Sequence, residues 1–300
     1  MAGQRGGHPM SQNEPVIRNV SDTAHWAAVY RARESGRPGA LFRDPFARRL
    51  AGERGEQIFA ALPARDRNEW AWVMRTFLYD QLIAEQLRQG ADLVVNLAAG
   101  LDARPYRMPL SSSLAWIEVD LPGVLSHKED MLRGEKPACA LERVPLDLSD
   151  VAARRALFER LGQRAARALI ITEGLLIYMT PDEVGALAGD LAAQRGFRRW
   201  ILDMVSPGLL RMMQKRMGAH LSRASAPFKF GPEEGPGFFI PFGWRPADVR
   251  SIARTAVRQG RAPLLVRLTS FLPESNGRQG SRPWGGVCLL EKQGTGVTTL

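Results

Sequence analysis

The middle of the chain contains short apolar runs, each followed by residues that can bind a polar ligand. Asp120, Asp147 and Glu173 follow three of these runs, and a turn that contains Gly100 and Asp102 follows an earlier one. In nucleotide-binding α/β proteins, a carboxylate about 20 residues beyond a glycine turn accepts hydrogen bonds from the ribose hydroxyls. Asp120 has this spacing from Gly100, so the sequence predicts a ligand that contains a nucleoside.

The turn itself argues against a diphosphate. Its sequence is LAAGLD, whereas dinucleotide-binding proteins carry G-x-G-x-x-G. Gly100 is the position where a ligand could approach the backbone closely or where φ could be positive. Asp102 would occupy the positive end of the next helix, which a diphosphate would need. An NAD-dependent oxidoreductase therefore remains only as the alternative interpretation.

S-adenosyl-L-methionine meets these constraints. It offers a ribose to Asp120, an adenine to the edge formed by Asp147 and Leu148, and two cationic groups that carboxylates tolerate. Its own carboxylate requires a cation. Arg75, on the preceding predicted helix, can supply a bidentate guanidinium group, which lysine would not reproduce.

These residues have to be positioned by a sheet. The apolar runs predict parallel strands, because helix-like segments separate them and continuous apolar strands are typical of a sheet buried on both faces. The sequence therefore predicts an α/β fold with a Rossmann-like, doubly wound, mostly parallel sheet. Two later apolar segments joined only by loop predict antiparallel pairing at the C-terminal end. The predicted strands are 93–97, 114–119, 142–148, 168–172, 200–205, 263–271 and 285–292.

Helical periodicity dominates the first part of the chain, with a stripe that includes Trp72, Tyr79 and Ile83 and with Gly90 where a C-cap is expected. After the fifth predicted strand, an insertion over 206–243 is expected to cover the carboxyl edge of the sheet as a lid, and RPADVRSIARTAV is expected to form the final helix. The predicted organisation is a flexible tail (1–20), an N-terminal helical cap (21–90) and a catalytic domain (91–300).

Composition narrows the class of protein. With 300 residues and 45% hydrophobic content, the chain can bury one sizeable core. Cys139 and Cys288 are far apart, and we expect neither a secretion signal nor a membrane span, which predicts a cytoplasmic protein. The net charge of +10 comes from scattered arginines, so a nucleic-acid partner is not expected. The histidines are isolated, and no metal site is expected.

Several segments, taken in order, resemble one known family. They are SDTAHWAAVYRARES, FRDPFARRLAG, RTFLYDQLI, VVNLAAGLDARPYRM, WIEVDLPGVLSHK, VPLDLSD and TEGLLIYM. This pattern is similar to the bacterial branch of the leucine carboxyl methyltransferase family, a class I S-adenosylmethionine-dependent group. Ala103 departs from it, because the family usually has Thr there. The resemblance implies that Arg75 binds the cofactor carboxylate, Gly100 its methionine moiety, Asp120 its ribose, Asp147 and Leu148 its adenine, and Glu173 its amino end.

The residues at the predicted strand ends bear on the chemical class of the methyl acceptor. A carboxylate is already ionised at neutral pH and needs no base, whereas a phenol or an alcohol benefits from one. No histidine follows a predicted strand, which favours methyl-ester formation on a carboxylate of a small molecule or a peptide. O-methylation of a phenol or an alcohol of a natural-product intermediate is the alternative, and a methyltransferase acting on RNA and a non-catalytic binding module are further rivals. Tyr178 is the candidate catalytic residue, with its hydroxyl lining the substrate pocket.

Overall fold

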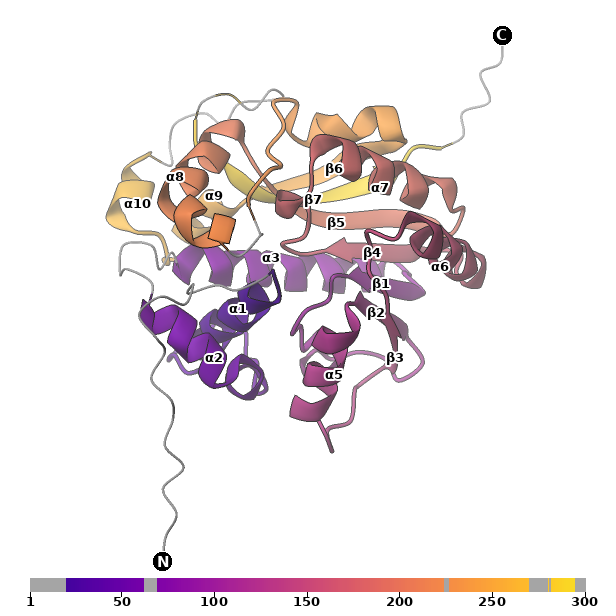
Figure 1. Cartoon of the computed structure of the whole chain (residues 1–300), viewed down its shortest axis with the longest axis horizontal. Helices are drawn as coiled ribbons and strands as arrows, with labels where there is room; N and C mark the ends of the chain where they lie inside the picture. The colour runs from indigo at the N-terminus through magenta and orange to yellow at the C-terminus, as the bar shows by residue number, and fades with distance from the viewer. Residues whose placement is uncertain (1–19, 62–68, 224–226, 270–279, 281, 295–300) are drawn as a thin grey trace, which may run out of the picture.

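A seven-stranded sheet forms the centre of the protein (Figure 1). The computed structural model describes residues 20–61, 69–223, 227–269, 280 and 282–294. The strand order is β3-β2-β1-β4-β5-β7-β6, and β7 runs antiparallel to both of its neighbours, β5 and β6. The predicted doubly wound, mostly parallel fold is therefore confirmed. The strands are β1 (Leu93–Leu97), β2 (Ala115–Asp120), β3 (Ala140–Pro145), β4 (Ala168–Thr172), β5 (Phe197–Val205), β6 (Trp244–Ser251) and β7 (Gly285–Lys292).

Both faces of the sheet are covered, as the continuous apolar strands require. Val95 of β1 packs toward the helices on one face, whereas Val94 packs toward those on the other, because successive side chains of a strand point to opposite faces. All residues of β1 and β4 are buried. The covering helices are α6 (Val151–Arg164), α7 (Pro181–Ala193) and η3 (Gly235–Phe242) on one face, and α3 (Glu69–Arg88) and α9 (Ile252–Arg258) on the other.

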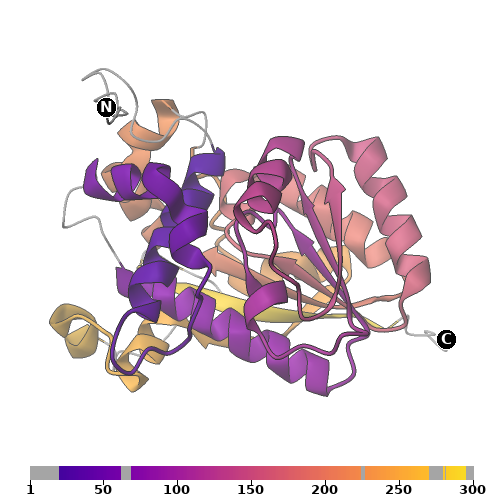
Figure 2. The ribbon, with the colours of Figure 1, turned by 90° about the horizontal axis from the view of Figure 1, so that it is seen from below.

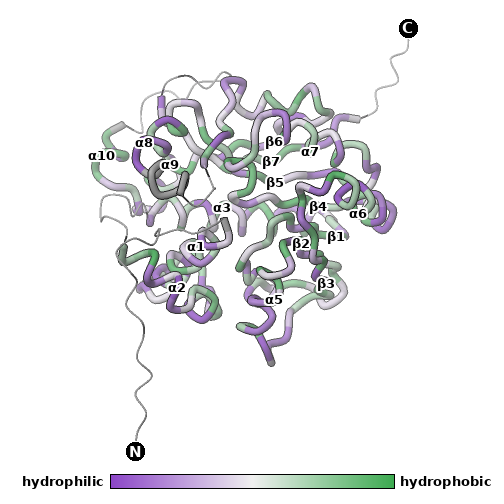
Figure 3. Tube along the Cα trace, in the orientation of Figure 1, coloured by the Kyte–Doolittle hydropathy of each residue, from purple (hydrophilic) through white to green (hydrophobic). Residues whose placement is uncertain are grey.

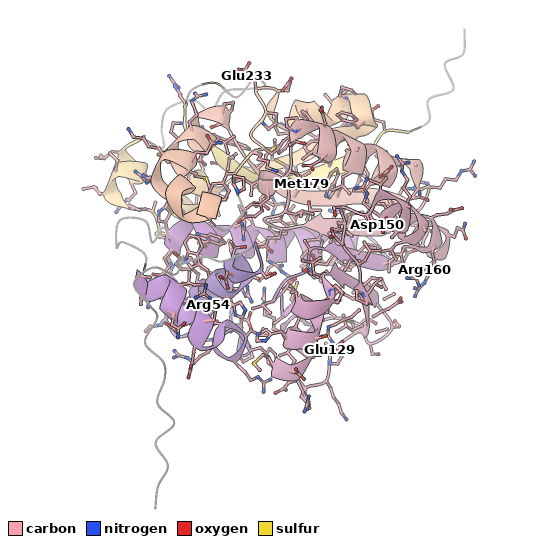
Figure 4. All side chains as sticks on the ribbon, viewed as in Figure 1. Arg54, Glu129, Asp150, Arg160, Met179 and Glu233 are labelled. Carbon is pink, nitrogen blue, oxygen red and sulfur yellow. The ribbon has the colours of Figure 1, made fainter. Side chains whose placement is uncertain are left out.

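Helices α1 (Val20–Ser35) and α2 (Ala47–Ala61) pack against each other and, through α1, against α3 (Figure 2). Their contact includes a cluster of aromatic rings in which Trp26 and Tyr30 of α1 lie against Trp72 of α3. Arg54 of α2, labelled in Figure 4, donates a hydrogen bond of 3.0 Å to Asp22 of α1. The predicted helices of this region are confirmed, including the left-handed Gly90 beyond α3.

The remaining helices are short or begin with clear start signals. Thr180 and Glu183 form a capping box at the start of α7, where Pro181 follows the cap, and Asp150 caps α6. In Figure 3 the hydrophilic parts of the chain lie mainly at the periphery, as in α5 and α6. The other elements are α4 (Arg104–Arg107), α5 (Pro122–Met131), the 3-10 helix η2 (Leu176–Tyr178), α8 (Pro207–Arg223) and α10 (Leu264–Thr269).

Two predictions for the C-terminal part were wrong. The segment RPADVRS does not start a helix but belongs to β6, whose burial alternates along the strand and whose pairing shifts register between Pro246 and Asp248. Proline is tolerated there because β6 is an edge strand. The described part of the segment 263–271, residues 263–269, does not pair with β7, since β5 and β6 occupy both edges of β7. This part forms α10 instead.

The predicted lid segment divides between two places. Leu209 and Met213 of α8 face the cavity described below, whereas Phe239 of η3 is fully buried against Trp200 and Trp244 in the core of the sheet. The lid itself stays a prediction. In the described part of the chain, no helix is long and apolar enough to cross a membrane, and no group of three or more potential ligands could hold a metal ion.

Candidate active site

A cavity of about 1490 Å³ lies at the carboxyl ends of the strands. It adjoins the ends of β1 and β4, the neighbouring strands at which the chain reverses its direction across the sheet. In open α/β sheets, ligands bind at this switch point. The structure brings all of the sequence-predicted site residues to this one cavity, namely Arg75, Gly100, Asp120, Asp147, Leu148, Glu173 and Tyr178.

The turn after β1 is held by the carboxylate that ends β2. Ala98 and Gly100 both have positive φ, 52° and 49°, which confirms the expected tight turn. The Gly100 amide donates to Oδ2 of Asp120 at 2.6 Å, and the Leu121 amide donates to Oδ1 at 2.7 Å. Burial raises the pKa of Asp120 above its usual value, although both amides oppose this. A ribose beside the turn would meet this carboxylate directly.

Asp147 and Leu148 form the outer rim of the cavity, beyond the end of β3. Asp147 is exposed and accepts a hydrogen bond of 2.9 Å from the amide of Ser149, which lowers the pKa of Asp147. The Leu148 carbonyl accepts one of 3.0 Å from Nη1 of Arg154. The rim therefore offers a fixed backbone edge and an apolar side chain, which is an arrangement suited to a flat heterocycle.

Arg75 lies between two carboxylates and an aromatic ring. Its Nε donates to Glu173 at 3.1 Å, and its Nη1 lies 3.5 Å from Asp203. Its guanidinium carbon stands 4.6 Å from the centre of the Trp72 ring, which restricts the side chain further. Asp203 also accepts a hydrogen bond of 2.6 Å from the Gly174 amide. Arg75 is thus held at the cavity wall with a fixed orientation.

Arg104 connects the turn to the end of β4. It is buried and bonds to Asp80 at 2.7 Å, Asp102 at 3.0 Å and Glu173 at 2.7 Å. Burial alone would raise the pKa of Asp102, but the neighbouring cations, first Arg104, then Lys128 and Arg107, lower it to about 2. Asp102 is therefore a charged partner of Arg104 rather than an unpaired group in the turn.

Asp203 and Arg104 were not predicted as site residues from the sequence. Asp203 interrupts the apolar run WILDMV, and a charged residue inside a buried strand is a signal that could have identified it. Arg104 carries no such signal, because its three partners come from separate segments and meet only in the fold.

The charges of this cluster match S-adenosylmethionine. Five carboxylates pair with four guanidinium groups, which leaves an excess of one negative charge. The carboxylates are Asp44, Asp80, Asp102, Glu173 and Asp203, and the guanidinium groups are those of Arg31, Arg75, Arg104 and Arg107. The ligand carries a sulfonium, an ammonium and a carboxylate, and so has one net positive charge. Binding of this ligand would neutralise the net charge of the cluster.

Tyr178 reaches the same cavity from η2. Burial raises the pKa of Tyr178 above its usual value, although a hydrogen bond with Thr23 opposes this. Its ring lies 5.5 Å from that of Phe228. At neutral pH the hydroxyl therefore keeps its proton, so it can donate a hydrogen bond but is a poor base.

Gly174 is expected to be essential for the position of Arg75. Its φ is 68°, and a Cβ at this place would lie 3.2 Å from Nη1 of Arg75. Gly174→Ala should therefore displace Arg75 and weaken S-adenosylmethionine binding about tenfold or more, while about 1–2 kcal/mol of backbone strain lowers the stability of the fold. Isothermal titration measures this.

Gly260→Ala is the matched control for that variant. Gly260 has a similar φ of 65°, but a Cβ there would meet nothing within 4 Å. It should lower the melting temperature as Gly174→Ala does and leave binding unchanged. Equal affinities in the two variants would contradict the role given to Gly174.

The chain is similar in sequence to proteins of one family. Residues 24–192 match the model of the leucine carboxyl methyltransferase family. A relative from Streptomyces avermitilis, named "Putative S-adenosyl-L-methionine-dependent methyltransferase", is 30% identical over 80% of this chain and 87% of its own length. A protein from Frankia alni with the same description is 32% identical over 81% of this chain and 88% of its own length.

Solved structures share the fold at low sequence identity. A duf574 family protein from Streptomyces avermitilis superimposes with a TM-score of 0.58 at 10% identity, over 91% of this chain and 97% of its own. A protein from Thermobifida fusca titled "putative methyltransferase" superimposes with a TM-score of 0.52 at 17% identity, over 93% of this chain and 96% of its own. At such identities the likeness concerns the fold alone.

Proposed function

Because this chain belongs to the leucine carboxyl methyltransferase family and is an S-adenosylmethionine-dependent methyltransferase, we propose that it converts a carboxylate of its acceptor into a methyl ester. The family and the relatives leave no support for the NAD-dependent alternative. The observation that carries the proposal is the lack of a histidine base: among the described residues that line the cavity there is no histidine, and Tyr178 holds its proton. The carboxylates of the cavity lie at the strand ends, where Asp120 and Glu173 already accept hydrogen bonds from protein groups. A carboxylate acceptor needs no base.

The proposed step is a displacement at carbon. When bound, S-adenosylmethionine supplies a methyl group attached to a positively charged sulfur. An oxygen of the acceptor carboxylate forms the new bond to the methyl carbon, the carbon-sulfur bond breaks, and its electron pair stays on sulfur as the neutral thioether. No proton has to move, whereas a phenol would release one.

The protein's contribution is to hold both partners in line. Arg75 and Glu173 fix the amino-acid end of the cofactor, and Asp120 fixes its ribose. Such positioning can contribute about 7–11 kcal/mol to a two-substrate reaction when the geometry is near ideal. The Tyr178 hydroxyl would donate a hydrogen bond to the acceptor carboxylate and orient it toward the methyl group.

Tyr178→Phe is expected to lower kcat/KM for the acceptor about tenfold or more. A hydrogen bond to a charged group contributes about 1.5–3 kcal/mol, and the substitution removes only the hydroxyl. The dissociation constant of S-adenosylmethionine should not change. Steady-state kinetics and titration measure the two quantities separately.

Tyr106→Phe is the control, because the Tyr106 hydroxyl accepts its hydrogen bond from Arg143 and does not line the cavity. Its kcat/KM should stay within about twofold of the wild type, well below the effect of one charged hydrogen bond. An unchanged Tyr178→Phe variant would exclude a direct role for this hydroxyl.

Methylation assays on the purified chain test the carboxylate proposal. Carboxylic acids, phenols of the same carbon framework and RNA are each incubated with S-adenosylmethionine, and formation of S-adenosylhomocysteine is measured. A product that loses its methyl group in mild base is an ester, and one that keeps it is an ether. The proposal predicts base-labile products from acids, and turnover confined to phenols, alcohols or RNA would refute it.

A further inference from the structure

The cavity has two chemically different halves. The half at the strand ends contains all of its described carboxylates, those of Asp102, Asp120, Asp147, Glu173 and Asp203. The half formed by α8, α9, α10 and residues 280 and 282–285 is mainly apolar. In this second half, Leu209, Met212 and Met213 of α8 line the cavity together with Trp284. The second half is called the acceptor half below.

The charged side chains among the described residues that line the acceptor half all have one sign. Arg216, Arg254 and Arg282 line it, and none of its described lining residues carries a carboxylate. A surface with cations of one sign beside an apolar wall favours an anion and repels a cation. The same half disfavours a small polar acceptor, because desolvated polar groups would find few partners on the methionine and tryptophan side chains.

The entrance to the acceptor half is also apolar. Leu264, Leu265 and Leu268 of α10 are 69%, 74% and 58% exposed, which is unusual for three leucines in one short helix. Leu265 lines the cavity, but Leu268 does not. An apolar molecule entering beside α10 would cover Leu265 and remove its side chain from water.

The size of the cavity leaves room for a second large molecule. Pockets for one drug-sized ligand measure about 300–1,000 Å³. The volume of about 1490 Å³ exceeds that range. S-adenosylmethionine bound in the half at the strand ends would fill one such volume, which leaves the remainder for an acceptor with a substantial hydrocarbon part.

We propose that the acceptor is an amphiphilic acid, with an extended apolar body that lies between α8, α10 and Trp284 and a negative charge that the arginines of the acceptor half attract. This inference rests on the proposed methyl transfer, for which it names the class of substrate. Met212 and Met213 suit a body of variable shape, because methionine side chains adapt to irregular surfaces.

Binding of straight-chain carboxylic acids to the full chain saturated with S-adenosylhomocysteine tests the proposal. Affinity should rise about fourfold for each added methylene, the factor that corresponds to about 0.8 kcal/mol per buried CH₂. Isothermal titration from butanoic to decanoic acid, below micelle-forming concentrations, gives this slope. An affinity that does not depend on chain length, or no binding of any acid, would overturn the proposal.

Alcohols of the same chain length test the charge. Each acid should bind at least threefold more tightly than its alcohol, and the difference should shrink in 1 M salt, where the screening length is about 3 Å. Equal binding at low salt would overturn the anionic part of the proposal.

Two α10 variants provide a matched pair. Leu265→Glu places a carboxylate in the cavity wall and should weaken decanoate binding at least tenfold, since it removes apolar contact and repels the anion. Leu268→Glu makes the same change on the same exposed helix but outside the cavity. Its affinity for decanoate should stay within about twofold of the wild type, as expected for surface substitutions. An equal loss of decanoate affinity in both variants would show that the acid adsorbs to the surface of α10, and it would contradict the proposed position of the apolar body in the cavity.

Turnover separates this inference from the proposed function. If long acids bind with the predicted slope but only phenols or alcohols of similar size are methylated, the carboxylate proposal fails and the apolar binding site remains. If short and long acids are methylated with the same kcat/KM, ester formation holds and the inference about the apolar body fails.

Discussion

Replacement of Arg104 by alanine is expected to lower the free energy of unfolding by about 3–5 kcal/mol, the range for breaking a buried ion pair from one side. The Arg104 side chain is 2% exposed and compensates Asp80, Asp102 and Glu173 at once. Its removal would leave these carboxylates with uncompensated charge next to one another. The melting temperature should fall by roughly 10 °C.

Thermal and denaturant unfolding measure this change, and Arg160→Ala provides the comparison. Arg160, labelled at the edge of the molecule in Figure 4, pairs with Glu142 at 3.2 Å, but its side chain is 51% exposed. Exposed pairs contribute about 0–1 kcal/mol because solvent screens them. Similar losses in the two variants would mean that the buried cluster adds nothing beyond ordinary surface charge.

Asp120→Ala is expected to weaken S-adenosylmethionine binding about 100-fold or more. The proposed contacts are two hydrogen bonds from ribose hydroxyls to the carboxylate, each contributing about 1.5 kcal/mol or more. The substitution also releases the amides of Gly100 and Leu121 and so loosens the turn. Isothermal titration should detect the loss, while the melting temperature reports on the turn alone.

The control and the pH dependence make this prediction specific. Asp130→Ala removes the same charge from α5, where Asp130 pairs with Arg133 in solvent, and should leave affinity unchanged. Because burial raises the pKa of Asp120, wild-type affinity should fall as the pH drops through that raised pKa and the carboxylate gains its proton. Asp120→Asn should not show this pH dependence. Binding of Asp120→Ala within threefold of the wild type would exclude the ribose contact.

The parallel part of the fold could be predicted because its signals are local. The strands 93–97 and 168–172 coincide with β1 and β4, since each is a short apolar run bounded by turn residues. The C-terminal part could not be predicted in this way. β6 contains a proline and alternating polar residues, and its strand conformation depends on pairing with β7, which follows more than thirty residues later.

Some residues of the candidate site could be predicted from the sequence, and others could not. Asp120 and Gly100 could be predicted because they are related by a spacing within one strand-helix-strand unit, and the structure joins them by a hydrogen bond. The cluster around Arg104 could not, because it joins α3, the turn after β1 and the end of β4. Its members are close only after the sheet has formed, and their types alone resemble ordinary surface charge.

The place of β7 inside the sheet constrains the order of events during translation. β7 is made after β6 but lies between β5 and β6, so β6 has no neighbour in the sheet until β7 has left the ribosome. Trp284 and Gly285, which complete one wall of the cavity, emerge at the same moment. The nascent chain can therefore form the strand ends around Gly100 and Asp120 early, but the wall of the cavity that contains Trp284 forms only after β7 has been synthesised.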